Sequence, residues 1–392
     1  QKQPPYKIKE TLHISLDRNM GNTQAKPKLT ETAEEIQKEI ESSSSTFKSK
    51  YTKIAYTNID KYHKQVHDQF QTEFKHLDRW QKFMKKLDEN FFYTAKQFPK
   101  LNRYGNVLAN EHSRVNLLQG EKNSVNYINA NLIPNDAFGT NDLVYSYIAT
   151  QAPLPNTFEH FWTMILQYKV PMIVMVTSLE QGYKVKADQY WPDKVNEKIE
   201  HDSISITLVK EDANDTFVER QLYLETSYNG EPLSHTVTQI QYVQWPDFGV
   251  PKTTDGIRQL MDRMNKVIET TFPMMALSKQ KEAFEKNEDL SVNSTARIPV
   301  GTSPIPPIVV HCSAGIGRTG TFIAIHSILQ QLLHHNIVQN SSQQFLFNVF
   351  RTVQVLKKQR IGMVQTKQQY DFIFKAIIDE LSVKPQYYYP KY

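Results

Sequence analysis

PIVVHCSAGIGRTG, which occupies residues 307–320, carries the strongest structural signal in this sequence. The β-branched residues before Cys312 predict a buried strand, and the apolar pattern that begins at Thr319 predicts a helix over residues 319–334. The glycines between them predict a tight turn. Such a turn points successive backbone N–H groups inward, and the N-terminus of the helix adds positive potential. We therefore expect a strand, a loop and a helix that together bind a tetrahedral anion.

Cys312, at the start of this loop, is the only cysteine among 392 residues and cannot form an internal disulfide. The positive potential of an anion-binding loop favours the thiolate form of a cysteine, which is the nucleophilic form. A free cysteine is more often a small buried apolar residue, and that is the alternative here. Arg318 favours the chemical interpretation, because a guanidinium binds two phosphate oxygens at once and a lysine does not.

The rest of the chain predicts one large domain with two polar segments. Residues 1–60 are polar, contain a serine run at 42–45, and are expected to form a partly helical or disordered extension. Residues 61–385 are expected to form the folded domain. Within it, residues 278–307 are rich in Lys, Glu, Asn, Ser and Pro and predict a surface insertion.

Periodicity predicts strands and helices in alternation along the domain. Short apolar or alternating runs predict strands over residues 126–133, 144–150, 172–177, 203–209 and 217–224. Amphipathic stretches predict helices from residue 59 to at least 77 and over residues 156–167, 254–267, 342–359 and 367–381. The expected fold class is α/β (α+β), a twisted mixed β-sheet flanked by helices.

Composition excludes several classes of function. The net charge of +5, from 46 basic and 41 acidic residues, mildly favours anionic ligands but is too small to predict nucleic acid as a partner. No apolar run approaches the roughly 20 residues of a membrane span, so no transmembrane segment is expected. His63 and His67 lie one helical turn apart with no further ligand in the pattern. We expect neither a metal nor a cofactor.

Residues 311–320, HCSAGIGRTG, resemble the signature loop of the tyrosine-specific, cysteine-dependent protein tyrosine phosphatases, in which five residues separate the cysteine from the arginine. Further segments similar to family motifs follow the family's order: NRY at 102–104, YINA at 127–130, IATQAPL at 148–154, FW at 161–162, QYWP at 189–192, WPDFGVP at 245–251 and MVQTKQQY at 363–370. The resemblance implies the protein tyrosine phosphatase fold and hydrolysis of phosphotyrosine in proteins through a cysteinyl-phosphate, without a metal.

The resemblance also implies a role for individual residues. Cys312 would be the nucleophile and Arg318 the phosphate ligand, while Asp247 would act as general acid and then as general base. The other catalytic candidates are Thr319, as a hydrogen-bond donor to the sulfur, and Gln365 and Gln369, which would hold the attacking water. Tyr104 would stack on the substrate ring and set the depth of the pocket, and Lys186 would pair with Asp247. The remaining substrate-binding candidates are Asn106, Phe248, Ser313, Ala314, Gly315, Ile316 and Gly317.

Three positions depart from the family pattern. Asn106 replaces the usual acidic residue two positions after the recognition tyrosine, and Gly105 offers no basic side chain to acidic residues that flank a phosphotyrosine. Gln181 stands where an acid that braces the arginine is often found, which leaves Glu180 as a candidate substitute.

Two alternatives stay open beside a phosphotyrosine phosphatase. The first is a catalytically silent phosphotyrosine-binding module, against which the intact set of Cys312, Asp247, Arg318 and Gln369 argues. The second is a phosphatase for phosphoserine, phosphothreonine or an inositol lipid, against which Tyr104 and the YINA segment argue. An easily oxidised thiolate favours a reducing compartment, so we expect the cytoplasm, of its own cell or of a host cell. Docking of a partner by the extension 1–60 is an alternative to a disordered tail.

Overall fold

The computed structural model describes residues 59–117, 125–138, 145–228, 231–246, 249–273, 305–338 and 348–385. Nearly all of the expected extension 1–60 and of the expected insertion 278–307 lie outside these ranges. The domain limits, and the docking role considered for the extension, therefore stay predictions.

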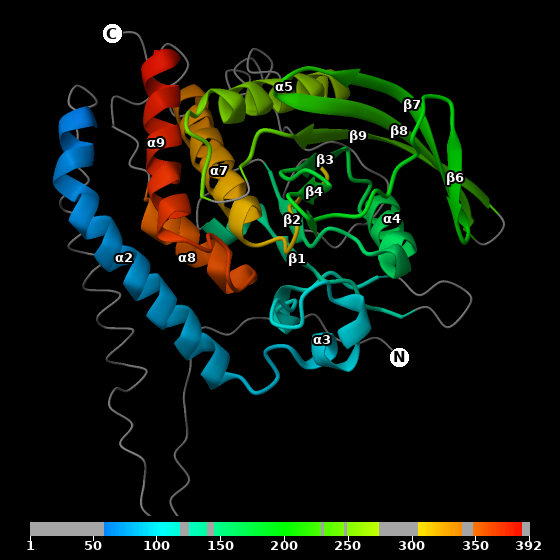
Figure 1. The fold of residues 1–392 in the computed structure, drawn as a ribbon, viewed down its shortest axis with the longest axis horizontal. Coiled ribbons are helices and arrows are strands. Elements are labelled where there is room, and N and C mark those ends of the chain that lie inside the picture. The colour runs from blue at the N-terminus through cyan, green and yellow to red at the C-terminus, as the bar shows by residue number, and fades with distance from the viewer. Residues whose placement is uncertain are drawn as a thin grey trace, which may run out of the picture.

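One eight-stranded sheet forms the centre of the molecule, with strand order β1-β2-β10-β3-β9-β8-β7-β6 (Figure 1). The strands are β1 (Ala130–Ile133), β2 (Tyr147–Thr150), β3 (Met172–Met175), β6 (Lys198–His201), β7 (Ile204–Ala213), β8 (Phe217–Tyr228), β9 (Glu231–Tyr242) and β10 (Ile308–His311). The four inner strands β2, β10, β3 and β9 run parallel, and all pairs outside them are antiparallel. A separate two-stranded hairpin pairs β4 (Glu180–Gln181) with β5 (Lys184–Val185). The predicted mixed sheet is confirmed.

Helices cover both faces of this sheet. They are α2 (Ile59–Leu87), α3 (Tyr93–Gln97), α4 (Phe158–Gln167), α5 (Asp255–Thr271), α7 (Gly317–Val338), α8 (Val349–Gln359) and α9 (Lys367–Val383). The helices α7, α8 and α9 lie side by side, and α2 runs along the outer side of α8 and α9 (Figure 1). None of the helices within the described ranges is both long enough and apolar enough to cross a membrane.

The alternation of side chains along β10 shows how the sheet divides the core in two. Ile308 and Val310 pack into the cluster that includes α2, α5, α7, α8 and α9, whereas Val309 packs into the cluster that includes α4. All four residues of β10 are buried, as expected for a parallel strand that is covered on both faces. The β10 strand therefore ends at His311 in the middle of the sheet, and the cysteine loop begins at its carboxyl end, where α/β proteins bind ligands.

The predicted strands are present with shifted ends, and four of the described strands were not predicted. The run 126–133 forms a strand only from Ala130, because the Asn129 side chain is hydrogen-bonded to Asn102 and to the Val107 carbonyl group. The strand predicted at 144–150 is β2, which begins only at Tyr147, with residue 144 outside the described ranges. The missed strands are β4, β5, β6 and β9. In β9, Gln239 and Gln241 are buried although their type indicates exposure.

The predicted helices are all present with shifted ends. The α4 helix begins at Phe158 because a 3-10 turn occupies Pro155–Thr157, and α5 extends to Thr271. The α2 helix continues to Leu87, well past the predicted residue 77. The predicted helix 342–359 is described from Val349 onward as α8, and its first residues lie outside the described ranges.

Candidate active site

Four carbonyl groups of the cysteine loop accept hydrogen bonds from residues outside the loop. The carbonyl of Ser313 accepts from the Ala152 N–H at 2.9 Å, and that of Ile316 accepts from the Val364 N–H at 3.1 Å. Both remaining carbonyls, of Ala314 and Gly315, accept from Arg360 at 3.1 and 2.8 Å. Because the C=O and the N–H of one trans peptide point in opposite directions, the N–H groups of the next residues, 314–317, face the opposite side. The first N–H groups of α7 there also lack a partner within the helix. An anion cradle requires such a backbone, and the binding role of residues 313–317 stays a prediction.

Gly315 makes this arrangement sterically possible. Its φ angle is +72°, and a Cβ at this position would lie 2.0 Å from the Thr150 carbonyl oxygen. The loop thus packs directly on the end of β2, and no residue with a side chain fits there.

Arg360, just after α8, was missed by the sequence analysis. It is fully buried, and besides the two loop carbonyls it donates to the side-chain oxygens of Asn129 and Asn131, each at 2.8 Å. Burial lowers its pKa to about 10, which still leaves the guanidinium charged at neutral pH. A fixed positive charge therefore lies directly behind the cysteine loop. The only available signal was indirect, since Asn129 belongs to the YINA segment that the sequence analysis singled out.

Cys312 is 5% exposed, and its Sγ accepts a hydrogen bond from the Gly315 N–H at 3.3 Å. The preceding residue, His311, lies in a chain of hydrogen bonds whose direction is fixed. The Cys312 carbonyl oxygen only accepts, so His311 Nδ1 carries the ring proton and donates to it at 3.0 Å. In the neutral ring Nε2 then accepts from the Tyr190 O–H at 2.7 Å, and the Tyr190 oxygen accepts from the Gln239 amide at 2.8 Å. Burial lowers the pKa of His311 to about 4, which keeps the ring neutral.

Arg318, in the first turn of α7, is half-buried in front of the loop. Its guanidinium donates to Thr177 Oγ1 at 3.1 Å, to Gln181 Oε1 at 2.8 Å and to the Pro246 carbonyl oxygen at 2.9 Å. Gln181 itself braces the arginine, so the expectation that Glu180 would substitute is wrong. The β4 strand alternates, which buries Gln181 and leaves Glu180 exposed on the other side.

Gln365 and Gln369 are brought against the same loop. A Cβ placed on Gly317 would lie 3.0 Å from Gln365 Oε1 and 3.0 Å from Gln369 Nε2, so both amides lie over this glycine. Gln369 also completes a capping box at the start of α9: its Oε1 accepts from the Thr366 N–H at 3.3 Å, and Thr366 Oγ1 accepts from the Gln369 N–H at 3.2 Å. The same Oε1 also accepts from the Gln365 N–H at 2.8 Å. The cap orients Gln369 and leaves its NH₂ group on the side of the cysteine loop.

Thr319 is fully buried in α7, and its hydroxyl oxygen has no hydrogen-bond partner among the described residues. The predicted hydrogen bond to Cys312 is therefore not formed in this structure. A buried hydroxyl without a partner is uncommon and costs free energy, so the position calls for a chemical explanation.

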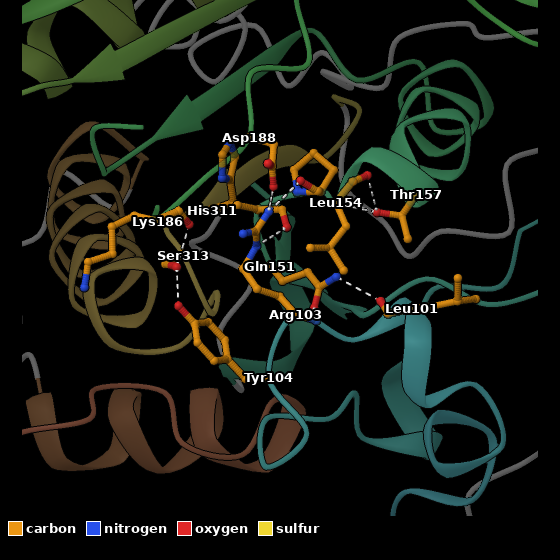
Figure 2. A network of polar contacts seen from close by, with 12 residues as sticks. Leu101, Arg103, Tyr104, Gln151, Leu154, Thr157, Lys186, Asp188, His311 and Ser313 are labelled. Carbon is orange, nitrogen blue, oxygen red and sulfur yellow. Dashed lines mark hydrogen bonds and ion pairs between the residues drawn. The ribbon is translucent and has the colours of Figure 1, made fainter. Parts of the chain in front are cut away.

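Tyr104 reaches the loop from a segment that its neighbours hold in place. Arg103 donates to the carbonyls of Ala152 and Pro153 at 3.0 and 2.8 Å and pairs with Asp188 at 2.5 Å (Figure 2). Asn102 donates to two backbone carbonyls and accepts from the Tyr127 hydroxyl group. The first two residues of the NRY motif are thus structural, and they fix the point from which the tyrosine extends.

The Tyr104 hydroxyl group lies 2.7 Å from Ser313 Oγ, and Ser313 Oγ donates to the Lys186 carbonyl oxygen at 2.6 Å (Figure 2). Because a carbonyl only accepts, the Ser313 proton points to Lys186 and the Tyr104 O–H donates to Ser313. This chain joins the recognition segment, the cysteine loop and the residue after β5.

Three of the predicted site residues, Asn106, Asp247 and Phe248, are not placed against the cysteine loop by any described contact. Asn106 is exposed two residues after Tyr104. Asp247 and Phe248 lie outside the described residues, between Pro246 and Gly249. The described ranges contain no group of three or more His, Cys, Asp or Glu side chains that could hold a metal ion.

Comparison with known proteins identifies relatives of the chain. A family profile described as protein-tyrosine phosphatase matches residues 98–379. A protein-tyrosine phosphatase of Arabidopsis thaliana is 35% identical over 285 residues, which are 71% of this chain and 70% of that protein. Tyrosine-protein phosphatase 3 of Dictyostelium discoideum is 35% identical over 81% of this chain and 28% of its own length. Human tyrosine-protein phosphatase non-receptor type 9 is 33% identical over 71% of this chain and 41% of its own length.

The coverage differs among these relatives. The chain spans more than two thirds of the Arabidopsis protein but less than half of the human and Dictyostelium proteins. In each of them the similarity covers more than two thirds of this chain, and the family profile covers the whole eight-stranded sheet, the helices α4, α5, α7 and α8, and most of α9. The chain therefore belongs to the protein-tyrosine phosphatase family of hydrolases.

Proposed function

We propose that the chain hydrolyses phosphotyrosine in proteins through a cysteinyl-phosphate formed on Cys312. The observation that carries the proposal is the position of the sulfur: it accepts an N–H from a loop whose four following carbonyls are all held on the far side. The N–H groups of residues 313–317 and the guanidinium of Arg318 would bind the three non-bridging phosphate oxygens. The thiolate then lies directly below the phosphorus.

In the first step, the sulfur forms a bond to phosphorus while the bond from phosphorus to the tyrosine oxygen breaks. The leaving phenolate needs a proton, which we assign to Asp247 as general acid. This role rests on the WPD sequence and the family, since Asp247 lies outside the described residues. Arg318 supports it, because it already donates to the carbonyl of Pro246, the residue before Asp247.

In the second step, water attacks the phosphorus and the bond to sulfur breaks, which releases inorganic phosphate. Asp247 takes a proton from this water, and the amides of Gln365 and Gln369 orient it from their places over Gly317. The thiolate regains its negative charge at this point. The Thr319 hydroxyl, for which the described part of the chain supplies no partner, is assigned as the donor that stabilises that charge, and this role would explain its burial.

Substrate choice is assigned to Tyr104 and to residues around the mouth of the cradle. The hydrogen bond from Tyr104 to Ser313 holds the ring upright beside the loop, where it can stack on the aromatic ring of phosphotyrosine. The Lys186 carbonyl oxygen accepts a hydrogen bond from Ser313 in the cysteine loop, which supports a position of Lys186 near the substrate. Asn106 and Phe248 complete the set from sequence alone. The cysteine chemistry suits a reducing compartment such as the cytoplasm.

The decisive experiment is a steady-state assay with an aryl phosphate and with matched phosphotyrosine and phosphoserine peptides. We expect turnover of the aryl phosphate and the phosphotyrosine peptide, and loss of all turnover in Cys312→Ser. Binding of phosphotyrosine without turnover by the native chain would instead indicate a silent binding module. Equal rates on the two peptides would remove the role assigned to Tyr104 and favour a broader phosphatase.

A further inference from the structure

Gln181 lies between the phosphate-binding arginine and the segment that leads to Asp247. Its Oε1 accepts from Arg318 at 2.8 Å, and its Nε2 donates to the Trp245 carbonyl oxygen at 3.1 Å. The amide can be oriented in only one way, because a guanidinium only donates and a carbonyl only accepts. Gln181 is 9% exposed, so water competes little for either bond.

The same nitrogen of Arg318 also donates to the carbonyl oxygen of Pro246 at 2.9 Å. Arginine and glutamine together therefore hold two successive carbonyl groups, those of Trp245 and Pro246. The Trp245 side chain is 2% exposed, packs at an angle against Phe372, and donates to the Gly249 carbonyl at 3.3 Å. The backbone immediately before Asp247 is thus linked to Arg318 by two routes, one direct and one through Gln181.

We propose that Gln181 is a positioning residue, which couples the guanidinium of Arg318 to the backbone that carries Asp247 and does so because it is an amide and not a carboxylate. A glutamate at this place would still accept from Arg318, in a stronger charge-assisted bond. It has no proton to donate, however, and would bring a charged acceptor oxygen against the Trp245 carbonyl. The bond to the acid segment would be replaced by repulsion, while the bond to the arginine would remain.

This inference rests on the proposed function and adds a consequence for its first step. Binding of the phosphate depends on Arg318, whereas protonation of the leaving group depends on the position of Asp247. Loss of the Gln181 to Trp245 bond should therefore slow substrates that need a proton on the leaving group and spare those that do not.

The test compares Gln181→Glu with the native chain on phenyl phosphate, which has a poor leaving group, and p-nitrophenyl phosphate, which has a good one. We expect kcat/KM, which covers the steps up to departure of the leaving group and not the later attack of water, to fall about tenfold on phenyl phosphate, as for one buried carbonyl left unpaired, and less than about twofold on p-nitrophenyl phosphate. The inhibition constant of inorganic phosphate should stay within about twofold, because Arg318 keeps its partner. An equal fall on both substrates, or none on either, would overturn the inference.

Two further variants and one direct measurement separate this inference from the proposed function. Gln181→Leu loses both bonds and should also weaken phosphate inhibition, whereas Gln167→Glu, which alters an amide that donates to the Asn116 carbonyl at 2.8 Å on the surface, should behave as native. Hydrogen exchange should be faster around Trp245 in Gln181→Glu and unchanged there in Gln167→Glu. Equal exchange would refute the coupling even in an active enzyme. Absence of turnover in the native chain would refute the proposed function while exchange still decides the coupling.

Discussion

Two arginines bind backbone carbonyls on opposite sides of the cysteine loop, and they differ in what surrounds them. Arg360 lies behind the loop, is fully buried, and donates to the carbonyls of Ala314 and Gly315. Arg318 lies in front, is half-buried, and donates to the carbonyl of Pro246 and to two side chains. The residue type is the same, but the first has only protein around it and the second faces the place assigned to the phosphate.

The difference shows how one charge can be structural and the other available for a ligand. Arg360 donates to two loop carbonyls and to the side chains of Asn129 and Asn131, so removal of the guanidinium leaves these buried acceptors without donors. The partners of Arg318 are a hydroxyl, an amide and one carbonyl, and the Thr177 hydroxyl and the Gln181 amide each keep a second hydrogen bond of their own, to the carbonyls of Ser178 and Trp245, when the arginine turns toward an anion. We expect stability to depend on Arg360 and catalysis to depend on Arg318.

Substitution Arg360→Met should have the largest effect and should fall on stability. Removal of the guanidinium leaves two loop carbonyls and the oxygens of Asn129 and Asn131 buried without donors, which should lower the free energy of unfolding by about 4 kcal/mol or more. Denaturant unfolding followed by far-UV circular dichroism measures this change. Arg351→Met is the matched control, because Arg351 is exposed on the helix that precedes Arg360 and its side chain donates to Gln354 on the same helix. Equal stability of the two variants would contradict the structural role.

Substitution Arg318→Lys should come next and should fall on catalysis. An ammonium cannot make the paired hydrogen bonds of a guanidinium to a phosphate, so kcat/KM for an aryl phosphate should drop about 10³-fold, or about 4 kcal/mol in the transition state. The free energy of unfolding should change by less than about 1 kcal/mol, because the lysine keeps the positive charge and Thr177 and Gln181 each keep a second hydrogen bond. A large loss of stability with little loss of activity would reverse the comparison of the two arginines.

A buried carboxyl group extends the comparison of the two arginines, because burial keeps this group protonated and uncharged. Glu73, on the inner side of α2, is 1% exposed and contacts the Tyr370 hydroxyl group. Burial raises its pKa to about 8; the bond from Tyr370 opposes this shift and nearby Asp371 adds to it. The raised pKa contributes stability that is complete below the unfolded value near 4.5 and is lost as the pH rises through 8.

Substitution Glu73→Gln should therefore remove a pH dependence. Between pH 5 and pH 8 the native chain should lose about 3 kcal/mol relative to the variant, which carries no ionisable group there. Unfolding free energies measured at several pH values in this window give the difference. Parallel curves for the two proteins would show that Glu73 titrates normally in the folded state.

The success of the sequence analysis at the cysteine loop has a physical reason. The strand, the loop and the first turn of α7 are consecutive in the chain. The apolar run, the glycines and the start of the helical pattern are therefore all visible in neighbouring residues. The position of Arg318 relative to Cys312 is fixed by the same short segment. Local patterns of this kind also predicted the helices and most strands, within a few residues at their ends.

The features that the sequence did not predict depend on contacts between residues that lie far apart in the chain. Arg360 binds Asn129, Asn131 and the cysteine loop, and nothing in its own neighbourhood indicates burial. The β9 strand was missed because Gln239 and Gln241 look exposed by type, yet both accept from Arg220 on β8 and are buried. Long-range pairing of polar groups inside the core leaves no periodic signal in the sequence.

The smallest expected effect concerns the rim of the site in front of the loop, where Tyr104→Phe removes one hydroxyl group. The Tyr104 O–H donates to Ser313 at 2.7 Å, but Tyr104 is 36% exposed, so the bond is worth about 1 kcal/mol. KM for a phosphotyrosine peptide should rise about fivefold with kcat unchanged, because the ring remains to stack on the substrate. Preference for phosphotyrosine over phosphoserine should persist in Tyr104→Phe and fall in Tyr104→Ala, as matched peptides would measure. Loss of that preference in the phenylalanine variant would assign selectivity to the hydroxyl and not to the ring.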